Sequence, residues 1–405
     1  EPHVHVGSFD RPNLRYTIEE KFKPLSQLLN FVDSQRDNCG IVYCSSRARV
    51  DDIASKLQGK GFNAAAYHAG YDTDHRIKVQ EQFQRDQVQI VVATVAFGMG
   101  INKPNIRFVV HYDLPKTIES YYQETGRAGR DGLPAECLMF FDSADIPRVK
   151  RLISDNPNEE RAKVELQRFN AMVALADAQT CRRQVLLHYF NEYTTTECGN
   201  CDVCLDPPKS FDGTLLAQQA MSCIYRSGQK FGVGHIIDVL RGSQNLRVKD
   251  HGHDKLSTYG LGKDHSHEYW LSIMRQLIHQ GVVEQDISRG SSLLLTEKSR
   301  PYLKGEQALS LAVPRLGSKH IYEQTVKVNY DKRLFARLKG LRKALAEEHD
   351  VPPFVVFSDA TLADMAQKTP TSQREMLAVS GVGQTKLQRY GQALLSVIER
   401  HLAGD

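Results

Sequence analysis

The chain has 405 residues, of which 41% are hydrophobic, and its net charge is +4 with a mean hydropathy of -0.43. This length exceeds one ordinary hydrophobic core, so we expect two to four domains. The sequence has no apolar run approaching ~18 residues and no basic-then-apolar stretch at its first residues, so neither a membrane span nor a signal peptide is predicted. Composition therefore argues against an integral membrane protein and favours a globular protein of the cytoplasm.

The charge of the chain is unevenly distributed. Residues 207–329 contain 16 lysines and arginines against 11 aspartates and glutamates, together with seven histidines, while the rest of the chain is close to neutral. A local basic excess favours an anionic partner, although a solvated basic surface has the same composition.

Residues 1–145 alternate between strand and helix patterns. Apolar strands are predicted at 40–44, 64–67, 89–94, 106–112 and 137–141, and amphipathic helices at 47–60 and 74–85. This alternation is typical of an α/β lobe in which helices flank a parallel sheet. Because ligands of such sheets gather at the carboxyl ends of the strands, we expect the motifs of this segment to lie there.

A glycine-rich turn follows the strand at 89–94. It contains Gly98 and Gly100, and residues without a Cβ atom let the backbone approach a phosphate group or a nucleic-acid strand closely. The turn is therefore a candidate binding loop.

A glycine-spaced arginine motif lies further along the same lobe. The run Gln123-Glu-Thr-Gly-Arg-Ala-Gly-Arg130 places two guanidinium groups on one short segment. Guanidinium groups match phosphate oxygens and stabilise the charge that develops during phosphoryl transfer. A surface ion pair of Arg127 with Glu124 or Asp131 is the alternative interpretation.

Together these two blocks resemble motifs V and VI of superfamily-two helicases, and their amino-acid sequence is similar to that of the RecQ family. The resemblance implies a RecA-like second motor lobe over 1–145, in which Arg127 and Arg130 reach the γ-phosphate of ATP and Gln123 senses the nucleotide. The implied nucleotide-binding residues are Gly98, Gly100 and Asn102. Many relatives have aspartate where Asn102 stands, but an amide oxygen still accepts a hydrogen bond from the ribose hydroxyl.

The resemblance also makes the segment after the strand at 40–44 motif IV, which contacts the tracked nucleic-acid strand in related helicases. The implied DNA-binding residues of the lobe are Ser45, Ser46, Arg47, His68 and Thr94. Hydroxyl and amide groups at a helix N-terminus suit a phosphate. An ordinary N-cap for Ser46, and a polar loop role for His68, are the alternatives.

Two parts of a complete ATP site are missing from the sequence. It contains no G-x-x-x-x-G-K-[ST] loop and no Asp-Glu pair after an apolar strand, which would hold the phosphates and Mg²⁺. We therefore expect this segment to be the C-terminal part of a longer enzyme, whose first lobe binds ATP and Mg²⁺. Alone, it should not hydrolyse ATP.

A helical module is expected over 146–206, ending in Cys198-x2-Cys201-x2-Cys204 with Cys181 upstream. Four thiolates suit a tetrahedral structural zinc ion. An iron–sulfur cluster and free thiols are the alternatives, but the usual bacterial cluster run would need a further cysteine after Cys204. The same arrangement recurs in RecQ-like proteins. The other four cysteines lie in or beside apolar segments and are expected to be small buried residues: Cys39, Cys44, Cys137 and Cys223.

Residues 207–316 have a helix-rich pattern followed by strand candidates at 282–284 and 291–296, which is typical of a winged helix. Lys255, Tyr259 and Lys263 combine basic and aromatic groups beside glycines, a composition that suits phosphate contacts and base stacking. The segment resembles the RecQ C-terminal winged helix, which binds the duplex ahead of the fork.

An all-helical module is expected over 330–405, after a linker at 317–329. Its first helix has an apolar stripe of Leu334, Leu338, Leu341 and Leu345. Its basic residues are expected on the other face, where they form a candidate DNA contact: Lys339, Arg342 and Lys343. The module resembles the HRDC domain, and a solvated basic face is the alternative to DNA binding.

The resemblance to RecQ helicases covers nearly the whole chain. It implies an ATP-dependent 3′-to-5′ DNA helicase of repair and recombination, which acts at single-strand/duplex junctions near the nucleoid and contacts a single-stranded-DNA-binding protein. Two other functions remain open: a non-enzymatic DNA-binding regulator built on a degenerate motor, and an RNA helicase. The intact arginine motif argues against the first, and the zinc and winged-helix modules argue against the second.

Overall fold

The computed structural model describes residues 7–98, 101–142, 145–155, 157–178, 180–286, 289, 292–314 and 329–404. The chain forms two compact units, one of residues 1–141, 174–205 and 322–405 and the other of residues 142–173 and 206–321. None of the helices in these described ranges combines the length and the apolar character that crossing a membrane requires.

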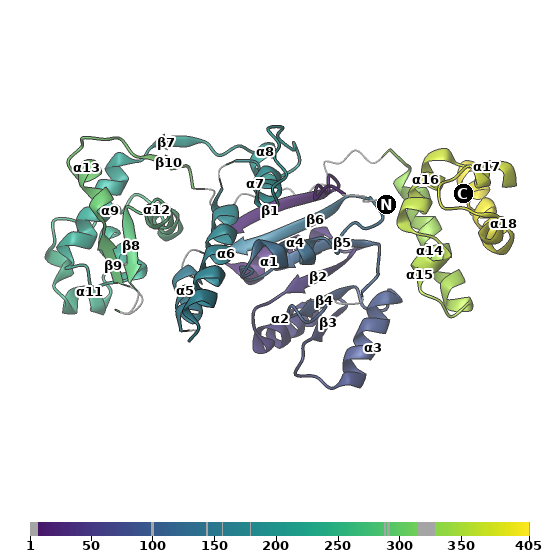
Figure 1. Ribbon diagram of the computed structural model, residues 1–405, viewed down its shortest axis with the longest axis horizontal. Coiled ribbons are helices and arrows are strands. Elements are labelled where there is room, and N and C mark those ends of the chain that lie inside the picture. The colour runs from purple at the N-terminus through teal and green to yellow at the C-terminus, as the bar shows by residue number, and fades with distance from the viewer. Residues whose placement is uncertain are drawn as a thin grey trace. The chain divides into compact units, whose positions relative to one another are not determined.

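The first unit contains a six-stranded sheet in the order β1-β6-β5-β2-β4-β3, in which all neighbours are parallel (Figure 1). The strands are β1 (Leu14–Glu20), β2 (Cys39–Tyr43), β3 (Ala64–Tyr67), β4 (Ile90–Ala93), β5 (Ile106–His111) and β6 (Ala135–Phe141). Every residue of β2, β4 and β5 is buried, as expected for central parallel strands. The predicted parallel α/β lobe is confirmed, whereas β1 was not predicted.

Two of the lobe helices cover one face of this sheet. The helices of the lobe are α1 (Pro24–Ser34), α2 (Arg47–Gly59), α3 (Thr73–Gln84) and α4 (Ile118–Thr125). Phe31 of α1 and Leu57 of α2 belong to one buried cluster with Val42 and Phe108 of the sheet, and burying such a side chain contributes about 1.5–3 kcal/mol. Gly40 is a glycine because a Cβ atom there would overlap the Phe108 ring.

The glycine-rich turn starts at one edge of the sheet, whereas the arginine motif lies toward the opposite edge. The glycine-rich turn begins after Ala93, at the carboxyl end of β4, as expected. The arginine motif does not lie at that edge, because α4 runs back along the sheet after β5. The Gly129 N–H donates to the carbonyl of Ile106, the first residue of β5, at 2.9 Å. The expectation that both motifs meet at the carboxyl edge is therefore wrong for the arginines.

Helices also make up the segment that carries the four cysteines. They are α5 (Asp145–Ser154), α6 (Glu159–Asp177), α7 (Arg182–Tyr189) and α8 (Asp202–Leu205). Cys181 is the N-cap of α7, and Cys204 lies in α8. Short contacts link α8 to β1 of the lobe, so this end of the segment packs on the sheet.

The second unit contains the predicted winged helix. Its helices are α9 (Thr214–Arg226), α10 (Val233–Leu240), α11 (Leu246–Asp250), α12 (His267–His279) and α13 (Arg300–Leu303), with short 3₁₀ turns η1 (His253–Lys255) and η2 (Glu297–Ser299). The strands β8 (Val283–Asp286) and β9 (Ser292–Leu295) pair antiparallel, and so do β7 (Ser210–Asp212) and β10 (Ser310–Ala312). Trp270 is fully buried at the centre, where its indole N–H donates to the Gly262 carbonyl at 2.8 Å.

The C-terminal module is all-helical, as predicted. Its helices are α14 (Lys332–Glu348), α15 (Pro353–Val356), α16 (Asp359–Lys368), α17 (Gln373–Leu377) and α18 (Gln384–Leu402). Leu334 and Leu338 of the predicted stripe are fully buried. The predicted linker at 317–329 lies outside the described residues except for Asn329.

Candidate nucleotide site and zinc centre

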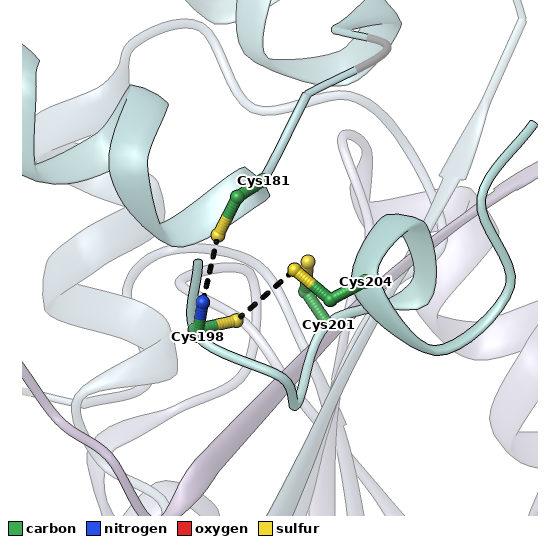
Figure 2. Close-up of side chains that lie close together, drawn as sticks. All are labelled: Cys181, Cys198, Cys201 and Cys204. Carbon is green, nitrogen blue, oxygen red and sulfur yellow. Dashed lines mark hydrogen bonds between the residues drawn. The ribbon is translucent and has the colours of Figure 1, made fainter. Parts of the chain in front are cut away.

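The four cysteines of the zinc motif converge on one point (Figure 2). The Sγ atoms of Cys181, Cys198, Cys201 and Cys204 all lie within 4.8 Å of one another. The Cys198 and Cys204 sulfurs are 3.9 Å apart, close to the ~3.8 Å that tetrahedral ligands at ~2.3 Å from zinc would have. The set leaves no position for a substrate, so it suits a structural Zn²⁺.

A buried ion pair lies next to the zinc ligands in the sequence. Arg182, next to the ligand Cys181, donates two hydrogen bonds to Asp202, each 3.0 Å long. Asp202 in turn accepts from the Ile18 N–H of β1 at 3.3 Å. Because both partners are buried, removing either one would leave an uncompensated charge. This pair was not predicted from the sequence, because Asp202 lies in α8, 20 residues further along the chain than Arg182.

The arginines of the arginine motif are held by backbone oxygens of the glycine-rich loop. Arg127 donates to the Gly98 carbonyl, and Arg130 donates to the Ile101 carbonyl at 3.1 Å. Arg127 is half-buried and Arg130 is exposed. Backbone oxygens orient a guanidinium without neutralising it, so the two positive charges stay available to an anionic ligand.

The carboxylates beside the arginine motif have other partners. Glu124 contacts the Nε2 atom of His111 at 2.6 Å, and Asp131 is paired with Arg107. The alternative in which Arg127 is paired with either of them is therefore excluded.

Positive charge is concentrated around Arg130. Burial lowers the pKa of its guanidinium, and the charges of Arg127 and Arg11 lower it further. Among the described residues, none of these three arginines forms an ion pair with a carboxylate. The cluster therefore has the charge and the donor groups that suit an anionic ligand.

Two glycines of these motifs are required by close approach. A Cβ atom on Gly98 would overlap the Arg127 guanidinium, and φ at Gly98 is +154°. A Cβ atom on Gly129 would overlap the Asn13 side chain, and φ there is +57°. Gln123 and Asn102, which are close to these arginines and glycines in the sequence, are both exposed. Gly100 lies outside the described residues.

The DNA-binding candidates of the lobe follow the carboxyl ends of β2, β3 and β4. The Ser45 N–H and hydroxyl both donate to Asp113 at 2.9 Å, and Ser46 is the N-cap of α2, where it accepts from the Arg49 N–H. Arg47 is exposed, and Thr94 is half-buried. The N-cap interpretation of Ser46 is thus confirmed, and a contact with nucleic acid stays a prediction for these residues.

His68 is buried and has a structural function in this edge. Its Nδ1 atom accepts the Gly70 N–H at 3.1 Å, so its Nε2 atom carries the proton and donates to Asp51 at 3.1 Å. Its ring also stacks on Tyr71, with centroids 4.2 Å apart. Both ring nitrogens are therefore occupied in shaping the loop.

Comparison with protein-family models matches four segments of the chain in order. They are the Helicase conserved C-terminal domain (20–132), the RecQ zinc-binding domain (143–205), the RQC domain (207–320) and the HRDC domain (331–398). ATP-dependent DNA helicase RecQ of Pasteurella multocida is 53% identical over 99% of the chain. The chain belongs to the RecQ family.

Other RecQ relatives give the same match. The protein of Haemophilus influenzae is 53% identical over 99% of the chain, and that of Bacillus subtilis 38% over 98%. The chain spans 64% of the length of the Pasteurella protein and 66% of each of the other two. The four-cysteine cluster lies within the RecQ zinc-binding match, so the predicted structural zinc site is confirmed.

Within the RQC match, the three predicted DNA contacts differ in exposure. Lys255 and Lys263 are exposed, and Tyr259 is half-buried against the domain core. The Tyr259 hydroxyl contacts the carbonyls of Gly242 and Ser243 at 2.9 and 3.2 Å. Tyr259 thus supports the fold of its own domain, which argues against the expected base stacking. Phosphate contacts stay a prediction for the two exposed lysines.

Within the HRDC match, one of the residues predicted to contact DNA is buried. Arg342 is 2% exposed and donates to Asp359 at 2.6 Å and to the Phe357 carbonyl at 3.0 Å. The expectation that it lies on the solvent face is wrong, because a buried carboxylate compensates its charge. Lys343 is exposed and Lys339 half-buried, so the basic face is smaller than predicted.

Proposed function

We propose that this chain supplies the second motor lobe and the DNA-binding modules of an ATP-dependent DNA helicase. The observation that carries the proposal is the group of uncompensated guanidiniums of Arg127 and Arg130 on the glycine-rich loop. RecQ relatives are named ATP-dependent DNA helicases, which supports the same activity and, by family resemblance, a 3′-to-5′ direction.

In this function, ATP and Mg²⁺ are held mainly by a first lobe, and this chain completes the site. Arg127 and Arg130 engage the γ-phosphate when the two lobes close, where guanidinium groups stabilise the charge that develops in the transition state. Gln123 and Asn102 are proposed to contact the nucleotide. Alone, the chain should bind DNA without hydrolysing ATP, since it has no phosphate-cradling loop.

The glycine-rich loop is suited to couple the two activities. It begins at Thr94, beside the DNA-binding candidates at the carboxyl edge of the sheet, and its carbonyls at Gly98 and Ile101 hold the two arginines. A shift of the arginines on hydrolysis would therefore move the start of the loop at the DNA edge. Coupling of this kind needs the loop to move as one body.

The proposed substrate is duplex DNA with a single-stranded tail, and the proposed role is in repair and recombination near the nucleoid of the cytoplasm. The RQC match, with its exposed Lys255 and Lys263, supports binding to the duplex. A single-stranded-DNA-binding protein is a further proposed partner by resemblance alone.

The central test is Arg130→Ala in an enzyme with both lobes. We expect ATP turnover to fall by ~10³-fold or more, as for other arginines that act across a cleft, while DNA binding is retained. Arg36→Ala is the matched control, because Arg36 is exposed and paired with Asp33. Near wild-type turnover by the Arg130 variant would remove this residue from the ATP site.

The same assay separates the other two functions. A non-enzymatic regulator would bind DNA without ATP turnover in the two-lobe enzyme. An RNA helicase would show ATP turnover that RNA stimulates more than DNA does. Turnover stimulated by DNA alone supports the proposal.

A further inference from the structure

The segment before β1 is hydrogen-bonded to the backbone of the arginine motif. The guanidinium of Arg11 donates to the carbonyls of Gly126, Ala128 and Gly129 at 3.4, 3.1 and 3.0 Å. The Asn13 amide donates to the carbonyls of Gly129 and Leu133 at 2.8 and 2.9 Å. We call these two side chains the clamp, and they account for five hydrogen bonds to one turn of backbone.

The same segment also forms hydrogen bonds and an ion pair with the zinc module. Arg183, two residues after the zinc ligand Cys181, donates to the carbonyls of Arg11, Pro12 and Leu14 and is paired with Asp10 at 3.2 Å. Arg183 is buried, so these contacts are shielded from water.

Aromatic packing adds a second connection through Phe9. Its ring stacks on Phe190 at the end of α7, with centroids 4.5 Å apart, and meets Tyr122 of α4 edge-on at 5.7 Å. The Tyr122 hydroxyl donates to the Phe9 carbonyl at 3.0 Å. Residues 9–13 therefore lie between the zinc module and the helix that leads into the arginine motif.

We propose that Arg11 is a positioning residue for Arg127 and Arg130, and that residues 9–13 transmit the order of the zinc module to the arginine motif. The inference rests on the proposed function only where ATP turnover is concerned. An arginine that acts in a transition state must be held within a fraction of an ångström of its working place, so support from a neighbouring side chain affects rate more than binding.

The charge of Arg11 strengthens this assignment. The charge of Arg11 contributes to lowering the pKa of Arg130, and no carboxylate among the described residues forms an ion pair with either guanidinium. Fixing the turn by an amide alone would avoid the repulsion. Arginine at position 11 holds three carbonyls and also adds positive charge where an anion is expected to bind.

The first arm of the test uses the chain itself and needs no ATP. Hydrogen–deuterium exchange of the amides at 126–133 is compared among the wild type, Arg11→Ala, Arg11→Lys, Asn13→Ala and the control Arg36→Ala. We expect exchange to rise at least about ten-fold in Arg11→Ala, less in the other two clamp variants, and not in the control. Zinc content should stay at one per chain, which shows that the module is intact.

The second arm measures steady-state ATP turnover in an enzyme with both lobes. We expect Arg11→Ala to lower kcat at least about ten-fold with KM changed less than about two-fold, because the arginines act in the transition state. Arg11→Lys should recover part of kcat, since one ammonium keeps the charge but cannot reach three carbonyls together.

The outcomes are separable. Wild-type exchange at 126–133 in both Arg11→Ala and Asn13→Ala overturns the clamp, whatever the turnover. Raised exchange with unchanged kcat, in an enzyme that Arg130→Ala inactivates, overturns the positioning role. If Arg130→Ala itself is fully active, the proposed function fails, and the exchange arm alone decides the clamp.

Discussion

At the scale of single residues, several carboxylates of the lobe are paired within the fold, whereas Arg127 and Arg130 have no carboxylate partner among the described residues. Asp113, at the carboxyl edge of the sheet, is an example: it accepts from the Ser45 N–H and hydroxyl and forms ion pairs with Lys21 and Arg49 at 3.0 and 2.6 Å. Burial opposes its ionisation, but Lys21, the Ser45 N–H and Arg49 outweigh that effect and hold its pKa below the ordinary value. The motif that follows β2 is therefore fixed by a charge.

Replacing Asp113 by asparagine should destabilise the lobe in a pH-dependent way. At pH 7 we expect a loss of about 1–3 kcal/mol, because the ion pair between Asp113 and Lys21, whose side chains are 10% and 9% exposed, is lost. A carboxyl whose pKa is lowered by folding stabilises the protein above its ordinary pKa, and the contribution is lost as pH falls through the lowered value. The difference between wild type and variant in urea unfolding should therefore shrink below about pH 4.

Asp33→Asn is the control for this measurement. Asp33 and its partner Arg36 are each 61% exposed, so the loss should be within about 0.5 kcal/mol at any pH. An Asp113 variant as stable as the wild type at pH 7 would contradict the role given to this carboxyl.

What the sequence reveals at this scale depends on where a residue's partners lie. The cysteine spacing and the arginine motif are local patterns, and both were recognised. Arg342 was misplaced because its partner Asp359 comes from a different helix, and a buried ion pair leaves no mark on helical periodicity. Arg11 was missed for the same reason, since its partners lie 115 to 118 residues further along the chain.

At the scale of elements, the sequence predicted every strand of the lobe sheet except β1. The five predicted strands are apolar runs, whereas β1 reads Leu-Arg-Tyr-Thr-Ile-Glu-Glu and lies at an edge of the sheet. Charged residues at an edge strand weaken the apolar pattern on which strand prediction depends. The return path of α4 also cannot be inferred from periodicity, and it places the arginine motif away from the carboxyl edge of the sheet.

The zinc module yields the prediction at this scale. We expect one zinc per chain, and we expect Cys201→Ala to lose the metal and unfold the module, because structural zinc supplies folding free energy on the order of 10 kcal/mol. Elemental analysis and circular dichroism measure the two effects. Cys223→Ala is the control, since Cys223 is a buried cysteine of α9 that lies outside the cluster. Pure, folded wild-type protein without zinc would refute the site.

At the scale of the whole molecule, the modules differ in net charge. The cluster proposed to face ATP consists of a few arginines within an otherwise balanced lobe, while the basic excess of the chain lies in residues 207–329. The family matches place the RQC domain over most of that region. A protein of this kind would hold DNA largely through phosphate contacts there, whether or not ATP is bound.

The last prediction is therefore that this chain binds a tailed DNA fork mainly through residues 207–316 and without ATP. The logarithm of the affinity should fall with the logarithm of salt concentration by ~0.9 for each phosphate contact. The double variant Lys255→Ala and Lys263→Ala should reduce that slope by roughly two units if both exposed lysines touch the backbone. The matched control is Lys56→Ala with Lys368→Ala, two lysines already paired with Asp52 and Asp364.

Deleting the HRDC domain from 330 onward gives the opposing measurement, because this module has a core of its own. Of the HRDC residues predicted to contact DNA, Lys343 is exposed and Lys339 is half-buried. The HRDC domain can therefore add DNA contacts but should not contribute most of the affinity. Salt titrations of the deletion and of the double lysine variant are compared on the same fork. If the deletion abolishes binding while the lysine variant binds like the wild type, the main DNA site lies in the HRDC domain and the assignment to the winged helix is wrong.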